Sequence, residues 1–259
     1  ALAGAVLFVG FVFIDAMNAL IDTEFQERMR QDVTVTFVEP RSASALHDLE
    51  HLPGVMRVEP GRMVPVRLRA GHRERTLAIT GLPTTPTLNR VIDQAGRPHA
   101  MPPEGLLVSS ILAEVLGVTA GDAITVEVLE GARPVVVEPV AALIDDNLGL
   151  QAYMNIDRLH RLMREGGSLS GAYLQVDESM LGDLHAQLKL VPAVAGVALT
   201  EAMRRSFQEI MAENLNLQVL INVVFAGIIA CGVVYNAARI SLSERSRELA
   251  SLRVLGFTR

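Results

Sequence analysis

The stretch that decides the architecture of this chain is LNLQVLINVVFAGIIACGVVY, residues 215–235, which carries no charged side chain. At ~1.5 Å per residue, a helix of about 21 residues crosses the ~30 Å hydrocarbon core of a bilayer. Its polar members Asn216, Gln218 and Asn222 fall in the first third, near an interface or against a neighbouring helix. The stretch predicts a transmembrane helix, which we place at 214–238.

A second apolar stretch, ALAGAVLFVGFVFIDAMNALI, opens the sequence and predicts a transmembrane helix at 1–22. It starts without Met, so we expect a longer protein whose helix begins upstream. A cleaved signal peptide is the alternative, but its positively charged start and small-residue cleavage pattern are missing. Asp15 would lie at the interface near the helix end or face a helical partner.

Arginines set the orientation of the chain. The positive-inside tendency places the flank that follows the second span in the cytoplasm. This flank contains Arg239, Arg245, Arg247, Arg253 and Arg259. Residues 23–213 are therefore expected outside the cytoplasm, beyond what we interpret as a bacterial inner membrane.

Composition excludes several classes of site. Cys231 is the only cysteine and lies in the second span, which excludes a disulfide framework and a cysteine zinc site. The net charge of -6 gives no indication of nucleic-acid binding, so no nucleic-acid partner is expected.

The residues next to each span predict helical stalks. Apolar residues recur at three- and four-residue spacing from Leu20 to Met29, and again from Met203 to Met211, among charged neighbours. Each stalk should lead straight into its membrane helix.

The segment after the first stalk alternates as a strand does and then predicts a helix. DVTVTFVEP (32–40) predicts a strand that ends at Pro40, and Ser42 is positioned to cap the helix ASALHDLEHL (43–52). Three further strands follow, VMRVEP, MVPVRLRAG and RERTLAITGL, with Gly71 in a hairpin turn.

The same pattern returns late in the chain. GAYLQVD predicts a strand, ESMLGDLHAQLKLV a helix and AGVALT a strand. Two such units separated by an insertion predict an α+β fold with a split, ferredoxin-like (porter-like) α/β sandwich, built from 31–82 and 170–200. Both stalks would then enter this domain from the same side.

The insertion, 83–169, predicts a small β-rich lobe. It contains the strand GLLVS, a short helix, a turn at Gly121-Asp122 and two strands that can pair, ITVEVLEG and RPVVVEPVAALI. The segment NIDRLHRLMREG adds a helix, with Asn155 or Asp157 as its cap and Gly166-Gly167 at its end.

The serine and lysine patterns favour no enzyme. There is no G-x-x-x-x-G-K-[ST], and the only lysine, Lys189, falls in a predicted helix, so this chain cannot hold ATP by a P-loop. There is no G-x-S-x-G either, and Ser109-Ser110 is interpreted as a helix cap.

Three sets of residues have a chemical alternative to a structural role. His47 and His51 could form a metal pair, although a solvated helix face accounts for them. Asp145-Asp146 could be a catalytic carboxylate pair, although neighbouring strand residues point to opposite faces and DDNLG suits a turn. The methionines could line an adaptable groove or fill the core. We expect no catalytic residue, cofactor or metal.

The last stretch, NAARISLSERSRELASLRVLGFTR (236–259), predicts a helix with apolar leucines among charged residues, which Gly256 ends. It could be a solvated helix held by Glu/Arg pairs or a docking helix for a cytoplasmic partner. The stretch closely resembles the signature of the FtsX-like/MacB-type ABC transporter permeases, S-L-x-E-R-x-R-E-[LI]-x-x-L-R-x-L-G after a span that ends in Asn. The matching residues are Asn236, Ser241, Leu242, Glu244, Arg245, Arg247, Glu248, Leu249, Leu252, Arg253, Leu255 and Gly256.

The resemblance implies a permease with a large extracytoplasmic core domain between its first two spans. It also implies a separate ATP-binding subunit, a homodimer or pseudo-dimer with another permease half, contacts with membrane lipids and a periplasmic adaptor. Within the cytoplasmic coupling segment 239–259, the residues expected to contact the ATPase are Glu244, Arg245, Arg247, Glu248, Arg253 and Gly256. Their role would be mechanotransmission, and ATPase activity would reside on the partner.

The function that the resemblance implies is export or extraction of a lipophilic or peptide substrate, or regulation without transport. The alternative is a membrane sensor with an extracytoplasmic ligand-binding domain, which would need a signalling sequence after Arg259. A membrane-anchored hydrolase needs a nucleophile constellation, and the sequence contains none.

Overall fold

The computed structural model describes residues 12, 21, 23–146 and 149–254, without the side chains of 212–219, 222 and 242–254. The chain divides into two compact units. One is formed by Ala19–Ser206, and the other contains the long helix from Phe207 onward. Each unit is described by itself. The first expected span, 1–22, lies outside the described residues apart from Val12 and Ile21.

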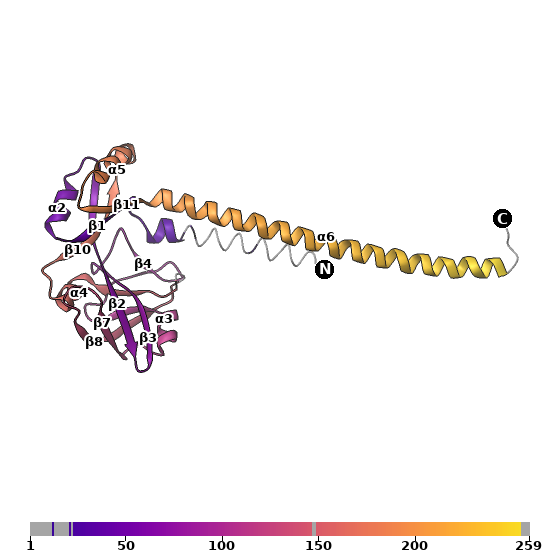
Figure 1. Ribbon diagram of the computed structural model, residues 1–259, viewed down its shortest axis with the longest axis horizontal. Coiled ribbons are helices and arrows are strands. Elements are labelled where there is room, and N and C mark those ends of the chain that lie inside the picture. Colours follow the sequence, from indigo (N-terminus) through magenta and orange to yellow (C-terminus); the bar gives the residue numbers. More distant parts are fainter. Residues whose placement is uncertain (1–11, 13–20, 22, 147–148, 255–259) are drawn as a thin grey trace. The chain divides into compact units, whose positions relative to one another are not determined.

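The first part of the 19–206 unit is a four-stranded antiparallel sheet, β11-β1-β10-β2, with helices packed on one face (Figure 1). In two places a helix connects strands that are separated by one other strand. Its elements are β1 (Val33–Ser42), α2 (Ser44–Glu50), β2 (Val55–Ala70), β10 (Ser168–Val176), η2 (Glu178–Met180), α5 (Leu181–Lys189) and β11 (Val194–Leu199).

The apolar face of this sheet packs against the apolar faces of α2 and α5. Val33 and Val35 of β1 are fully buried against Leu49 of α2 and against Leu184 and Leu188 of α5. The period of two in the strand and of three to four in the helices makes both apolar faces meet.

Two local expectations here are wrong. The strand does not end at Pro40, because β1 continues to Ser42; its pairing with β10 is interrupted between Thr36 and Arg41, where proline has no N–H to donate. Ser42 does not cap α2. It is the last residue of β1, and the N-cap position is Ala43, which makes no side-chain cap hydrogen bond.

The second part of the unit is a closed six-stranded barrel. Its strands follow the order β2-β3-β9-β6-β8-β7, and β7 pairs back onto β2. Its elements are β3 (Arg73–Leu82), β6 (Leu106–Ser109), α3 (Ser110–Leu116), β7 (Ala123–Val128), β8 (Val135–Ile144), β9 (Ala152–Asn155) and α4 (Ile156–Met163). Closure leaves this part of the sheet without a free edge.

Strand β2 belongs to both parts. Residues 55–61 pair with β10 of the sheet, and residues 62–70 pair with β3 of the barrel. The expectation of two separate strands, VMRVEP and MVPVRLRAG, is therefore wrong, because Gly61 and Arg62 continue the extended chain. By strand pairing, 62–82 forms barrel wall, so the parts join near Gly61 and not at 82/83.

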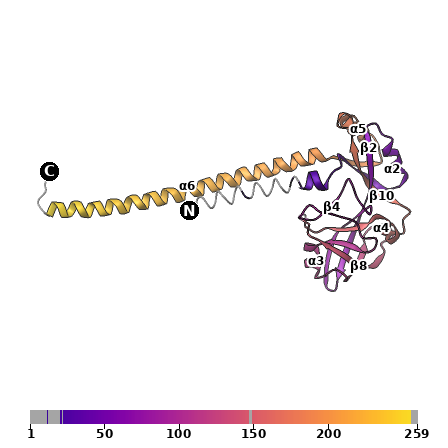
Figure 2. The ribbon, with the colours of Figure 1, turned by 180° about the vertical axis from the view of Figure 1, so that it is seen from behind.

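The loop 83–103 and the first stalk meet beside the barrel. A short hairpin in this loop, β4 (Val91–Ile92) with β5 (Pro98–His99), follows an antiparallel bridge between Met29 and Asn89. The described part of the first stalk is η1 (Thr23–Arg28), which is a π-helix. In Figures 1 and 2, α2 and α5 lie at one end of this unit and β8 at the other.

Several expected turns and caps are present. Gly71 has a positive φ in the β2–β3 hairpin, where a residue without Cβ is unstrained. Ser109 caps α3 by accepting a hydrogen bond from the Leu112 amide, and Asn155 caps α4. Helix α4 ends before Gly166-Gly167, because Arg164 already takes the left-handed conformation.

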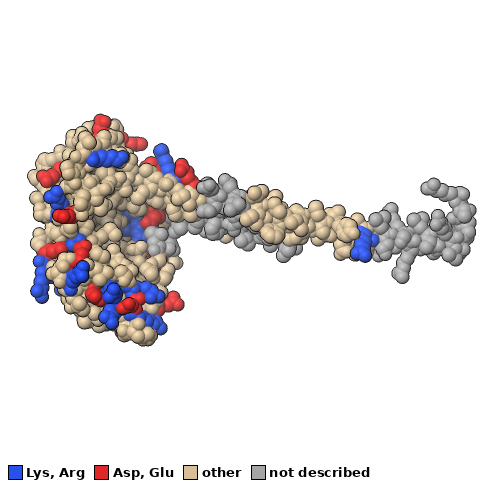
Figure 3. Space-filling model, in the orientation of Figure 1, with Lys and Arg blue, Asp and Glu red and all other residues tan. Residues whose placement is uncertain are grey.

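Helix α6 (Thr200–Val254) is continuous through the expected second stalk, the apolar stretch and most of segment 239–259. One segment among the described residues, Val223–Ser241, is long and apolar enough to cross a membrane by length and composition. Large apolar side chains such as Phe225, Ile228 and Val234 are more than half exposed there. Figure 3 shows few charged side chains along the described part of the helix on the visible face. By sequence, Arg239 is the only charged residue of Val223–Ser241. A helix that is apolar all round needs an apolar surrounding.

Candidate functional site

The residues expected to contact an ATPase lie on the last turns of α6. Glu244, Arg245, Arg247, Glu248 and Arg253 are helical positions, and their side chains are outside the described set. Gly256 lies outside the described residues altogether. Their contacts with a partner stay a prediction.

The described part of the chain contains a buried ion pair at the base of the first stalk, which we call the stalk joint. Arg28 of η1 forms two hydrogen bonds with the Asp146 carboxylate, Nη1 to Oδ1 at 3.0 Å and Nη2 to Oδ2 at 2.8 Å. Tyr153 of β9 donates its hydroxyl proton to Asp146 and lies beneath the Arg28 guanidinium, 5.8 Å from the ring centre. The side chains of Arg28 and Asp146 are 7% and 2% exposed.

Charge pairing keeps this arginine ionised despite its burial. Burial opposes the charge, but the hydrogen bond from Arg28 to Asp146 and the nearby acidic groups hold the pKa of Arg28 above its usual value. Burial also raises the pKa of Glu24, which lies 3.4 Å from Arg28, and that of the Tyr153 hydroxyl. Arg28 therefore stays charged where it binds Asp146, and this contact attaches η1 to the barrel.

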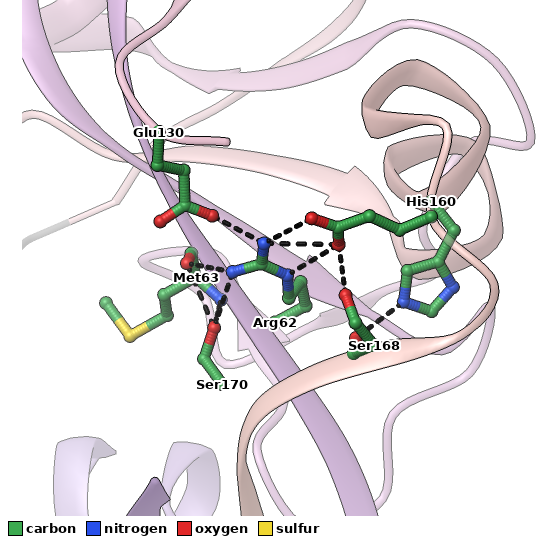
Figure 4. Close-up of polar contacts among 7 residues, drawn as sticks. Arg62, Met63, Glu130, His160, Ser168 and Ser170 are labelled. Atoms are coloured by element: carbon green, nitrogen blue, oxygen red, sulfur yellow. Dashed lines mark hydrogen bonds and ion pairs between the residues drawn. The ribbon is translucent and has the colours of Figure 1, made fainter. Parts of the chain in front are cut away.

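A second buried cation lies where the sheet and the barrel join (Figure 4). Arg62 of β2 is 1% exposed, and its guanidinium contacts groups from both parts. On the barrel side are Glu130, 2.5 Å from Nη2, and Glu165 after α4, 3.1 Å from Nη2. On the sheet side Nη1 donates to Ser170 of β10 at 2.9 Å. It also donates to the carbonyl of Met63, the next residue of β2, at 3.0 Å.

We call Arg62 and these partners the Arg62 cluster, and further hydrogen bonds fix the residues around it. Ser168 donates to Glu165, and the His160 ring lies 2.8 Å from the Ser168 carbonyl. Each of the three guanidinium nitrogens of Arg62 donates to at least one hydrogen-bond acceptor, so none of them is buried without a partner. The cluster fixes the sheet and the barrel to each other at the point where β2 crosses between them.

The chemical alternatives from the sequence find no support in the described residues. His47 and His51 are stacked edge to face 4.2 Å apart, and the described part of the chain contains no group of three His, Cys, Asp or Glu residues placed to hold a metal. Asp145 and Asp146 diverge: Asp145 is exposed and accepts from Ser110, whereas Asp146 is buried against Arg28. They do not form a carboxylate pair. Met101, Met154 and Met163 are core residues.

Sequence reasoning missed both arginine sites. Arg28 and Asp146 are 118 positions apart, and Arg62 and Glu165 are 103 apart, so no local spacing connects them. One signal was available: Arg62 interrupts an otherwise alternating strand with a charge at a position that the register turns inward.

Comparisons with known proteins give distant structural neighbours only. No family model matches the chain, and no curated protein matches it. The chain is similar to the extracellular domain of the noncanonic ABC-type transporter YknZ from Gram-positive bacteria, with 11% identity and a TM-score of 0.42, over 60% of this chain and 88% of that one. It is also similar to the periplasmic region of MacB from Actinobacillus actinomycetemcomitans, with 9% identity and a TM-score of 0.44, over 70% and 94%. Neither likeness is close enough to assign residues.

Proposed function

We propose that this chain is part of the permease subunit of an ABC transporter of the FtsX/MacB type. The observation that carries the proposal is the position of the C-terminal signature on α6. This helix contains the apolar stretch and then the signature residues Glu244 to Arg253. An uninterrupted helix does not bend at a flexible loop, so a displacement at one end can be transmitted along its axis.

In this proposal ATP hydrolysis on a separate subunit drives motion of the domain outside the cytoplasm. The sheet with α2 and α5 serves as the split, ferredoxin-like porter part, an interpretation supported by the strand order β11-β1-β10-β2. The partners would be a second permease half and a periplasmic adaptor, in a bacterial inner membrane. The cargo would be a lipophilic molecule or a peptide.

The two arginine sites support a mechanical role for the domain. The stalk joint attaches η1 to the barrel, and the Arg62 cluster attaches the barrel to the sheet. A buried arginine is destabilised when it loses its carboxylate, so both contacts would resist separation of the parts that they join. The stalk residues of η1, the barrel and the sheet would then move together as one rigid body.

The test is affinity purification of the full-length membrane protein in mild detergent, with identification of its cytoplasmic partner. A stoichiometric P-loop ATPase is expected, and Arg247→Glu and Glu248→Arg are each expected to release it. Arg259→Glu is the matched control, because it reverses a charge in the same segment outside the signature. Absence of any ATPase, or equal retention by all variants, would shift support to the sensor alternative.

A further inference from the structure

A cleft of about 920 Å³ opens in the 19–206 unit beside the first stalk. Its walls come from the end of η1 and the residues that follow it, from the loop segment 87–90, from β2 and the end of β10, and from the first turn of α6. The stalk joint is not part of its lining. Neither the permease signature nor the arginine sites described above account for this cleft.

Arginine is the most frequent residue type in the lining of the cleft, although the whole chain has a net charge of -6. The cationic lining residues are Arg30, Arg57, Arg90, Arg204 and Arg205, and the acidic ones are Asp32, Glu178 and Glu201. Two of these acids already have partners. Glu201 binds Arg204 and Arg205 at 2.8 Å, and Asp32 accepts the Val176 amide at 2.8 Å.

Three of the arginines remain without a counter-charge. Among the described residues, no carboxylate lies within ion-pair distance of Arg30, Arg57 or Arg90. Arg57 makes one neutral hydrogen bond, to the Thr87 hydroxyl at 2.9 Å. Five arginines and three acids line the cleft, so its charged side chains carry a net charge of +2, which favours an anion.

The backbone that supports these arginines is fixed by hydrogen bonds. The buried Glu59 carboxylate accepts the amides of Thr87, at 2.8 Å, and Leu88, at 3.0 Å. The Arg30 amide donates to the Leu88 carbonyl at 2.7 Å, and the Arg90 amide donates to the Arg28 carbonyl at 2.9 Å. The backbone that carries these side chains is therefore ordered before a ligand binds, which reduces the conformational entropy lost on binding.

The rest of the lining is partly apolar and contains one unpaired amide. Phe25, Leu88 and Leu181 contribute apolar surface to the wall. Gln31 belongs to the lining, is 2% exposed, and neither of its side-chain amide atoms has a hydrogen-bond partner. A buried amide without a hydrogen-bond partner destabilises the fold, and a ligand in the cleft that binds this amide would offset that cost.

We propose that this cleft binds a phosphate group, held by Arg30, Arg57 and Arg90. Guanidinium groups match phosphate oxygens with paired, charge-assisted hydrogen bonds. Apolar lining next to them suits a phosphate that carries an acyl chain, so an anionic phospholipid headgroup is one source. Free phosphate is the other source. This inference does not depend on the permease proposal.

The experiment measures binding to the full-length protein in a neutral detergent by isothermal titration calorimetry. Three probes are compared: dihexanoyl phosphatidylglycerol, dihexanoyl phosphatidylcholine and inorganic phosphate. The variant is Arg30→Gln combined with Arg90→Gln, and the matched control is Arg75→Gln, an exposed arginine of the β2–β3 hairpin. Thermal unfolding of each variant shows whether the fold is retained.

Saturable binding of phosphatidylglycerol, weakened about tenfold or more by the double variant and unchanged by Arg75→Gln, is the expected result. Equal binding of inorganic phosphate would also support the site and would assign it to the free anion. Phosphatidylcholine should bind at least about tenfold more weakly than phosphatidylglycerol. The proposal is overturned if neither anionic probe saturates, or if a folded double variant binds as tightly as the control.

Discussion

Removing the buried carboxylate of the stalk joint tests the structure most directly. Asp146→Ala leaves the Arg28 guanidinium, 7% exposed, without the acceptor of its two short hydrogen bonds. Breaking a buried pair in this way costs about 3–5 kcal/mol, and the remaining 3.4 Å contact of Arg28 with Glu24 places the expected cost toward the lower end of that range. We expect a loss of that size in the free energy of unfolding of the 19–206 unit.

The neighbouring residue supplies the control. Asp145 is exposed, and Asp145→Ala removes one surface hydrogen bond to Ser110, so we expect a loss of about 1 kcal/mol or less. The double variant Arg28→Met/Asp146→Leu removes both charges together. Because an apolar pair of similar volume avoids the desolvation cost, it should recover most of the stability that Asp146→Ala loses.

Pulse proteolysis of the full-length protein in a urea series measures these differences, since it detects the fraction of unfolded domain without an optical probe. Equal losses for Asp146→Ala and Asp145→Ala would refute the reasoning. They would mean that Arg28 finds water or another acceptor when Asp146 is gone, and that the joint does not hold η1 to the barrel.

Three further predictions concern the same unit. Gly171→Ala should destabilise it by about 2 kcal/mol or more in a urea titration, because the new Cβ would lie 2.2 Å from the Val35 carbonyl oxygen, whereas Gly196→Ala, with open space around it, should change stability little. Arg204 and Arg205 lower the pKa of Glu201 from 4.5 to about 2. The stability that the ionised Glu201 carboxylate contributes is therefore present above pH 4.5 and is lost as the pH falls through about 2. A carbon-13 NMR titration of the carboxyl group, with Glu201→Gln as reference, should show this midpoint. Gln31→Leu should raise the melting temperature, because it removes a buried unpaired amide, and a midpoint at or below that of the unchanged protein would contradict the assignment of an unpaired group.

The local elements could be predicted because their signals are local. Alternation of Val33 and Val35 predicted a half-buried strand. Residue type and position indicated a cap at Ser109-Ser110 and another at Asn155 or Asp157, and the structure selects Ser109 and Asn155. The errors were also local: Pro40 and Ser42 were interpreted from their usual preferences, and sheet pairing overrode both.

The candidate sites also differ in whether their residues are close together in the sequence. The coupling residues came from a contiguous signature, which a sequence displays directly. The stalk joint, the Arg62 cluster and the arginine cleft each combine segments that are far apart in the chain. A sequence without an alignment contains no information about which of its many arginines and carboxylates become neighbours.

By itself, the sequence determined that this chain has an apolar stretch of membrane-spanning length, strands and helices in a mixed order, and no P-loop or nucleophile motif. These properties depend on composition and on short periodicities, which are physical properties of single segments. Only the tertiary structure decided that β2 crosses from the sheet into the barrel and that the barrel closes through β7. Strand partners are chosen by burial of whole apolar faces, and the same choice determines which charged side chains are buried together.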